Sequence, residues 1–288
     1  MSEFQVDTRM ARELVDARFP EWAGLPLRPI EPGGWDHRSF RLGDEFVVRI
    51  PSAIGYVPQV AKEQTWLPRL AEALPLRVPT IVATGAPTAR FPHPWSVYGW
   101  IDGDTLARTP VDDEVAFARD LAGFLVALRR VETAGAPPPG LHSGWRGSAV
   151  GHWNDEVEAL LPRIGGGRRR ERAAALWRDA LAQPFVDAPV WVHGDVSTTN
   201  LLVRDGRLAA VIDFGCAAVG DPACDTVMAW TSFSGPSRTA FIEHLDVDEG
   251  TWARGRGWAL WKALTLLDSP DAAEVESARR TFDVLLDD

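Results

Sequence analysis

The chain has 288 residues, of which 45% are hydrophobic and 24% charged, and its formal net charge is −10. This apolar content can build a core, which excludes a wholly disordered chain, and the negative charge argues against a general nucleic-acid binder, which needs a basic face. The uncharged runs are shorter than the roughly 18 residues of a membrane-spanning helix. Charged residues in the first ten positions interrupt any signal-peptide core, so we expect a cytoplasmic protein with no nucleic-acid or membrane partner.

The first third of the chain predicts a mixture of helix and strand. Asp7 can cap a helix that carries Met10, Leu14 and Val15 on one face. A second helix is predicted over Gln59–Leu74 from its apolar spacing. Runs rich in β-branched and aromatic residues predict strands at Phe46–Ile50, Pro79–Thr84 and Trp95–Ile101.

The rest of the chain is mainly helical, with a short β insert. Helical periodicity runs from Asp112 to Val131, and the proline-rich stretch Ala134–Gly147 predicts a loop. Short strands are predicted at Val190–His193, Leu201–Arg204 and Leu208–Asp213, with Asp205-Gly206 as a hairpin turn. From Asp221 onward the pattern is helical. We therefore expect an α+β chain with a small sheet-containing N-terminal lobe, residues 1–102, and a larger mainly helical C-terminal lobe, residues 103–288.

Two motifs of polar residues stand between apolar strands. His193, Asp195 and Asn200 form an H-x-D-x-x-x-x-N pattern, and Asp213 begins an Asp-Phe-Gly triplet after the predicted hairpin. Here the sequence resembles the aminoglycoside phosphotransferase family, which has a bilobal protein-kinase-like fold. Members of that family phosphorylate hydroxyl groups of aminoglycosides, macrolides and small metabolites.

The resemblance implies a role for each residue of the two motifs. Phosphoryl transfer needs a group that takes the proton of the acceptor hydroxyl and oxygen ligands that place Mg²⁺ against the phosphates. Asp195 would be the catalytic base, and Asn200 and Asp213 the metal ligands. His193 would belong to the catalytic loop as a scaffold whose ring binds backbone near the metal site.

The nucleotide side is expected upstream of these motifs. Gly33 and Gly34 lie in a segment typical of a phosphate-covering loop, for which a plain β-turn is the alternative. Arg49 stands where most protein kinases have a phosphate-binding lysine, and Glu63 in the next helix would be its partner. Adjacent helical residues point about 100° apart, so Lys62 is predicted to be a solvated surface residue.

Other residues receive a structural interpretation or leave a choice open. Tyr98, Trp100 and Ile101 would offer backbone groups to the base, or simply belong to a buried strand. Asp221 is predicted to cap a helix, with Asp225 in its first turn. Further structural predictions are a solvated face for Arg168–Arg172, core positions for Trp258 and Trp261, and burial of Cys216 and Cys224.

These observations lead to a kinase that uses ATP or GTP with Mg²⁺ to phosphorylate a small-molecule hydroxyl, as a monomer or a dimer. Basic and acidic residues balance over residues 1–100, so the whole net charge lies in the second part and favours a cationic acceptor. An antibiotic acceptor would connect the protein with antibiotic resistance. The alternatives are a nucleotide-binding protein without transfer activity and a metal-dependent phosphohydrolase.

Overall fold

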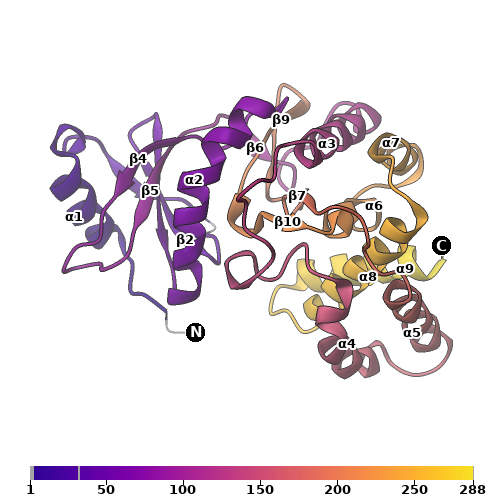
Figure 1. The fold of residues 1–288 in the computed structure, drawn as a ribbon. Coiled ribbons are helices and arrows are strands. Elements are labelled where there is room, and N and C mark those ends of the chain that lie inside the picture. Colours follow the sequence, from indigo (N-terminus) through magenta and orange to yellow (C-terminus); the bar gives the residue numbers. More distant parts are fainter. Residues whose placement is uncertain (1–2, 32, 288) are drawn as a thin grey trace.

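The computed structural model describes residues 3–31 and 33–287, which form a sheet-containing first part and a mainly helical second part (Figure 1). The predicted α+β class is therefore confirmed. Pro32, which begins the predicted glycine-containing loop, lies outside the described residues. None of the helices in the described ranges is long and apolar enough to cross a membrane.

An antiparallel sheet with strand order β1-β2-β3-β5-β4 forms the first part. Its strands are β1 (Leu27–Pro29), β2 (His37–Leu42), β3 (Phe46–Pro51), β4 (Ile81–Gly85) and β5 (Trp95–Gly99). Helix α1 (Thr8–Arg18) is capped by Asp7, as predicted, and buries Leu14 and Val15 in one cluster with Val48 and Ile50 of the sheet. This small core supports the strand that carries Arg49.

Helix α2 (Val57–Ala73) lies between the sheet and the helical part (Figure 1). Trp66, Leu67 and Leu70 on this helix belong to the hydrophobic cluster of the second part rather than to the cluster beneath the sheet. Glu63, by contrast, lies on the face that meets Arg49 of β3. The helix is therefore buried on more than one face and joins the two parts.

Two small sheets hold the polar motifs of the second part. Strand β7 (Val190–Val192) pairs with β10 (Ala218–Gly220), while β6 (Asp104–Thr105), β8 (Leu201–Arg204) and β9 (Arg207–Val211) form a three-stranded sheet. Asp205 and Gly206 have φ values of 52° and 71°, the left-handed conformation that a two-residue hairpin turn needs. The predicted hairpin is confirmed, and it brings Asn200 before β8 close to Asp213 after β9.

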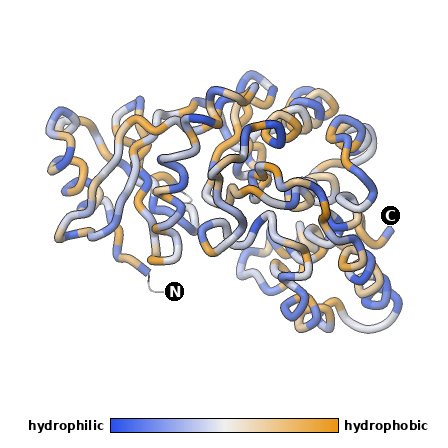
Figure 2. The backbone as a smooth tube through the Cα atoms, in the orientation of Figure 1, coloured by the Kyte–Doolittle hydropathy of each residue, from blue (hydrophilic) through white to orange (hydrophobic). Residues whose placement is uncertain are grey.

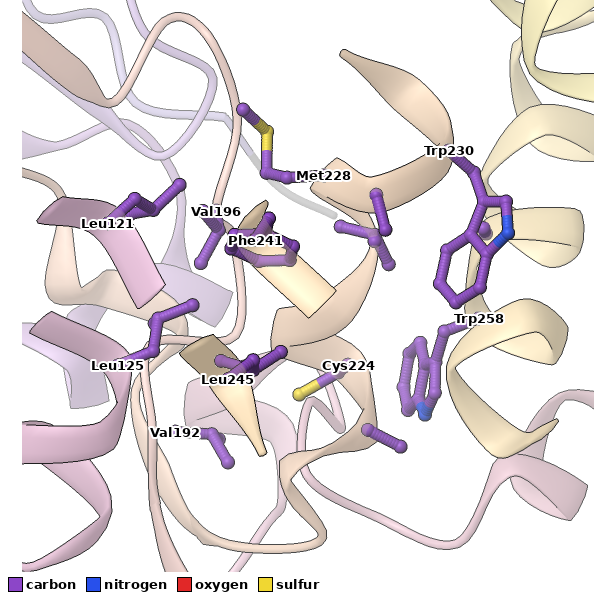
Figure 3. Close-up of a cluster of buried hydrophobic side chains, with 14 of the residues drawn as sticks. Leu121, Leu125, Val192, Val196, Cys224, Met228, Trp230, Phe241, Leu245 and Trp258 are labelled. Atoms are coloured by element: carbon purple, nitrogen blue, oxygen red, sulfur yellow. The ribbon is translucent and has the colours of Figure 1, made fainter. Parts of the chain in front are cut away.

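Helices surround these sheets and share one hydrophobic cluster. They are α3 (Glu114–Arg129), α4 (Asn154–Leu160), α5 (Arg168–Leu181), α6 (Met228–Thr231), α7 (Gly235–Leu245), α8 (Glu249–Leu266) and α9 (Ala272–Asp287). Hydrophobic and hydrophilic segments alternate along them (Figure 2), and the apolar side chains meet around Phe241, Trp230 and Trp258 (Figure 3). Trp258 and Trp261 are in the core, as predicted; Cys224 is buried and Cys216 only partly so.

Candidate active site

The loop after β7 carries the His-x-Asp motif and is held by buried hydrogen bonds. The backbone amides of His193 and Gly194 each donate to the Asp225 carboxylate at 2.8 Å. The buried His193 ring contacts the Ile212 carbonyl oxygen through Nε2 at 3.0 Å, and its Nδ1 accepts from the Asp195 amide at 3.3 Å. Both contacts are made by a neutral ring with its proton on Nε2. The ring therefore ties this loop to Ile212, the residue that follows β9 and precedes Asp213.

A glycine is required in the middle of this motif. Gly194 has a φ of 82°, and a Cβ there would lie 2.5 Å from the carbonyl oxygen of Cys216 and 2.7 Å from Cβ of Arg146. Any side chain would push the loop away from both neighbours. The close approach places the Arg146 side chain beside the catalytic loop.

Asp195 lies between an amide and a cationic side chain. Asn200 Nδ2 donates to the backbone oxygen of Asp195 at 2.9 Å and to its Oδ2 at 3.1 Å, and Lys262 Nζ is 3.3 Å from Oδ1. Burial alone would raise the pKa of Asp195, but the charges of Lys262 and Arg146 outweigh it and hold the pKa below its usual value. The carboxylate is therefore ionised at neutral pH and able to accept a proton.

Asp213 is placed beside Asn200 by the hairpin. The Ile212 amide donates to the Asn200 carbonyl oxygen at 2.9 Å, and Asp213 follows with a φ of 68°. Arg49 Nη2 donates to Asp213 Oδ1 at 2.8 Å. Burial opposes ionisation here too, but Arg49 holds the pKa of Asp213 well below its usual range. Asp213 is therefore a permanent anion at the junction of the two parts.

The oxygens of this pair suit Mg²⁺. Within the described ranges, no hydrogen-bond donor reaches Oδ1 of Asn200 or Oδ2 of Asp213. Carboxylate and amide oxygens are ligands that Mg²⁺ accepts, commonly with phosphate oxygens and water completing the shell. No group of three or more His, Cys, Asp or Glu side chains in the described part of the chain could hold an ion. A metal here would thus depend on a bound phosphate for further ligands.

The expected partner of Arg49 is present, but it is not the closest one. Arg49 Nη1 lies 3.7 Å from Glu63 Oε1, farther than the 2.8 Å from Nη2 to Asp213. The Tyr98 hydroxyl donates to Glu63 Oε2 at 2.5 Å. Burial raises the pKa of Glu63. The guanidinium therefore bridges strand β3, helix α2 and the candidate metal loop.

The glycine-containing loop is open at its glycines and anchored at its end. Nothing lies within 4 Å of the position that a Gly33 Cβ would take, and the Gly34 carbonyl oxygen accepts from Arg38 Nη1 at 2.9 Å. The Asp36 carboxylate accepts from Gln59 Nε2 of α2 at 2.8 Å. The loop is open at Gly33 and leads into β2, which fits both the phosphate-covering loop and the plain β-turn that the sequence left as alternatives.

The segment Tyr98–Ile101, which was expected to offer backbone groups to the nucleotide base, has few free backbone N–H donors. Tyr98 lies inside β5, between β3 and β4, and its hydroxyl is used by Glu63. The Trp100 amide donates to the Glu45 carbonyl oxygen at 2.7 Å. Among the residues that the structure describes, none accepts from the Ile101 amide. Of the three predicted base-binding residues, Ile101 therefore has the free backbone donor.

The prediction for Lys62 was wrong. Its side chain is buried and Nζ donates to the carbonyl oxygens of Gly215 at 2.6 Å, Ala217 at 2.8 Å and His142 at 3.2 Å. Burial lowers the pKa of Lys62 to about 8. Lys62 does point away from Glu63, but that side of α2 faces the second part of the molecule instead of solvent.

A small pocket beside Asp195 contains residues that the sequence analysis did not assign to the site. Its lining includes Arg146, Lys262, Trp258 and Trp261. Lys262 lies 67 residues from Asp195 in the chain, so no local motif connects them. The available signal was that Lys262 is one of only two lysines and lies one helical turn after Trp258.

Comparisons with known proteins show the family and the fold of the chain. Residues 26–258 match the model of a family described as "Phosphotransferase enzyme family", whereas no curated protein matches. The chain is similar to the GDP and kanamycin complex of APH(2")-IIia, with a TM-score of 0.75, 18% identity and coverage of 95% of this chain and 97% of that one.

Two further solved structures resemble the chain. A macrolide 2'-phosphotransferase type I has a TM-score of 0.66 and 22% identity, with 98% and 99% of the chains covered. The streptomycin-ATP-APH(2")-IIa ternary complex has a TM-score of 0.61 and 18% identity, with 99% and 97% covered. These likenesses establish a shared kinase-like fold. Because the family model covers most of its length, the chain belongs to this phosphotransferase enzyme family.

Proposed function

We propose that the chain transfers the γ-phosphoryl group of ATP or GTP to a hydroxyl group of a small molecule in the presence of Mg²⁺. The observation that carries this proposal is the meeting of Asp195, Asn200 and Asp213 with Arg49 at the junction of the two parts. The acceptor would be an aminoglycoside-like or macrolide-like antibiotic or a small metabolite. An antibiotic acceptor would make the protein a resistance enzyme.

Each side chain has a task in this reaction. Asp195 accepts the proton of the acceptor hydroxyl as its oxygen attacks the γ-phosphorus, and Asn200 and Asp213 would hold the metal. Bound there, Mg²⁺ would neutralise charge on the phosphate oxygens. Arg49 donates to phosphate oxygens from a position set by Glu63. His193 touches no reacting atom and positions the loop.

A nucleotide-binding protein without transfer activity is the second candidate. The contact between Arg49 and Asp213 favours it, because one carboxylate oxygen of the candidate metal ligand is already bound to a guanidinium. For transfer, Arg49 must exchange part of this contact for the phosphates. A metal-dependent phosphohydrolase has less support, since a two-metal site would need further acidic or histidine ligands.

Asp195→Asn tests the transfer reaction directly. The amide cannot take the hydroxyl proton, so turnover should fall by about 10²–10⁴ while nucleotide affinity changes little. ADP release would be measured with Mg·ATP and Mg·GTP and a panel of aminoglycosides, macrolides and small alcohols, and nucleotide affinity by calorimetry. Asp205→Asn, in the exposed hairpin turn, is the matched control.

Two outcomes would contradict the proposal. Turnover of Asp195→Asn at the parent rate would remove Asp195 as the base. Tight nucleotide binding by the parent protein without ADP release on any acceptor, or in water, would support the second candidate.

A further inference from the structure

We propose that the pocket beside Asp195 binds an anionic group of the acceptor, so that the substrate is a hydroxy compound carrying a carboxylate. This inference rests on the proposed phosphotransfer and concerns which acceptor enters it. It differs from the cationic acceptor that the net charge of the chain favours.

The side chains around the base carry local positive charge in an acidic protein. Lys262 and Arg146 line the pocket together with a single carboxylate, Asp195. No carboxylate of the described residues lies within ion-pair distance of Arg146, whose Nη1 donates to the Gly144 carbonyl oxygen at 3.4 Å and whose guanidinium packs over the rings of Trp153, Trp258 and Trp261. Arg146 therefore has a charge that a bound anion can neutralise.

The acid that accepts a hydrogen bond from Trp261 does not cancel this charge. Glu156 is exposed and accepts from Trp261 Nε1 at 2.7 Å, at the edge of the indole. Arg146 lies over the face of the same ring, 4.6 Å from its centre. An amino-sugar acceptor would bring ammonium groups towards Arg146 and Lys262, and like charges at short range repel. An acceptor carboxylate would instead find two donors.

The position of Lys262 connects anion binding with the reaction. Its Nζ is 3.3 Å from Oδ1 of Asp195, so the ammonium shares the oxygen that must receive a proton. A carboxylate that draws Lys262 towards itself leaves Oδ1 to the acceptor hydroxyl. The hydroxyl proton then passes to Asp195, a new O–P bond forms to the γ-phosphorus, and the bond to the bridging oxygen breaks to release the nucleoside diphosphate.

Buried apolar side chains support the pocket from below. Trp258, Val196 and Cys224 line the pocket and are also part of the buried cluster beneath it (Figure 3). Trp261 is stacked on Trp153 with ring centres 4.2 Å apart. Trp258 is buried, and Trp261 is covered by Trp153 and Arg146, so the polar groups that the pocket presents to an acceptor are the two cations and Asp195.

Three probes with the same phenyl ring and secondary hydroxyl isolate the charge. They are 3-hydroxy-3-phenylpropanoate, its neutral amide, and the cationic 3-amino-1-phenylpropan-1-ol. Binding would be followed by tryptophan fluorescence with Mg·ADP present, and transfer by ADP release from Mg·ATP and Mg·GTP. The carboxylate should bind, and its kcat/KM should exceed those of the other two by about tenfold or more.

Variants of the two cations assign the preference to the pocket. Lys262→Met and Arg146→Gln should each lower the preference for the carboxylate over the amide by about tenfold, since each removes one charged contact. Lys262→Arg should retain part of it. Arg172→Gln is the matched control, because Arg172 is an exposed arginine of α5 outside the pocket. The ratio between probes is the readout, because a change that only disturbs Asp195 lowers all three equally.

The outcomes separate this inference from the proposed function. The inference is overturned if the amine or amide equals the carboxylate, if only kanamycin or a macrolide is phosphorylated, if the carboxylate does not bind, or if Lys262→Met lowers all probes equally. Transfer to any acceptor would leave the proposed function standing in each case. Carboxylate binding that requires Lys262 and Arg146, with no ADP release on any acceptor, would retain the anion site and reject the proposed function.

Discussion

Arg49 makes two contacts of different length, and both determine how Arg49→Ala should change kcat/KM. It is bonded to Asp213 and lies farther from Glu63. Arg49→Ala should weaken transfer and leave Glu63 buried beside Tyr98 without a counter-charge, so Glu63→Ala should cost much less in that background than in the parent. We expect a coupling energy of about 0.5–3 kcal/mol from kcat/KM in the double-mutant cycle. Additive losses would mean that the two residues act independently.

Single residues could be predicted where a local motif carries them. Asp195, Asn200 and Asp213 lie within one loop-hairpin-loop segment, and the structure brings them together as the spacing indicated. The contacts of Lys62 and Lys262 could not be predicted from the sequence, because their partners come from distant parts of the chain. A helical angle says that two side chains diverge, but it does not say what covers each of them.

Helix α2 is tied to the segment after Asp213 by one buried ammonium group, that of Lys62. Lys62→Met keeps the apolar stem but leaves the Gly215 and Ala217 carbonyl oxygens without their donor. Hydrogen bonds to a charged group contribute about 1.5–3 kcal/mol, so we expect a loss of that order in unfolding free energy. Affinity for Mg·ATP should fall as well, because the segment after Asp213 is no longer held against α2.

The measurements would be urea unfolding and calorimetry with Mg·ATP. Arg69→Met, at an exposed position of the same helix, is the control for removing a cation from α2. Unchanged stability and nucleotide affinity in Lys62→Met would show that the three contacts contribute nothing to holding the loop.

At the scale of elements, segments with a clear helical or β-rich pattern were predictable, and short strands without one were not. The helix expected at Gln59–Leu74 is observed at Val57–Ala73, and the hairpin turn at Asp205-Gly206 is present. Strands β6 and β10 were missed, because neither lies in a run of β-branched or aromatic residues, whereas the equally short β7 does and was predicted.

Helix α2 of the first part contributes to the larger of the two hydrophobic clusters in the described residues. Leu70 is buried in the larger cluster although it precedes the predicted lobe boundary after residue 102. Leu70→Ala should therefore destabilise the entire protein by about 2–5 kcal/mol, as large-to-small changes in cores do. Tryptophan fluorescence and far-UV circular dichroism should give one coincident urea transition. Two separate transitions would show that the parts unfold independently.

Net charge describes the molecular surface and not one pocket. The excess of acidic residues lies in the second part of the chain, yet the pocket beside Asp195 contains two cations and one carboxylate. Fields of exposed charges fade over about 8 Å at 0.15 M salt, so neighbours within a few ångströms decide what binds. A sum over the sequence could therefore not predict the charge of the acceptor.

The scarcity of lysine has a practical consequence for chemical labelling. Both side-chain amines of the protein lie at the candidate active site, one buried under three carbonyl oxygens and one partly exposed beside Asp195. Every other cationic side chain apart from histidine is an arginine, which amine-selective reagents ignore. Acylation followed by peptide mass spectrometry thus has Lys262 as its accessible side-chain target, and protection of that one residue reports directly on an occupied pocket.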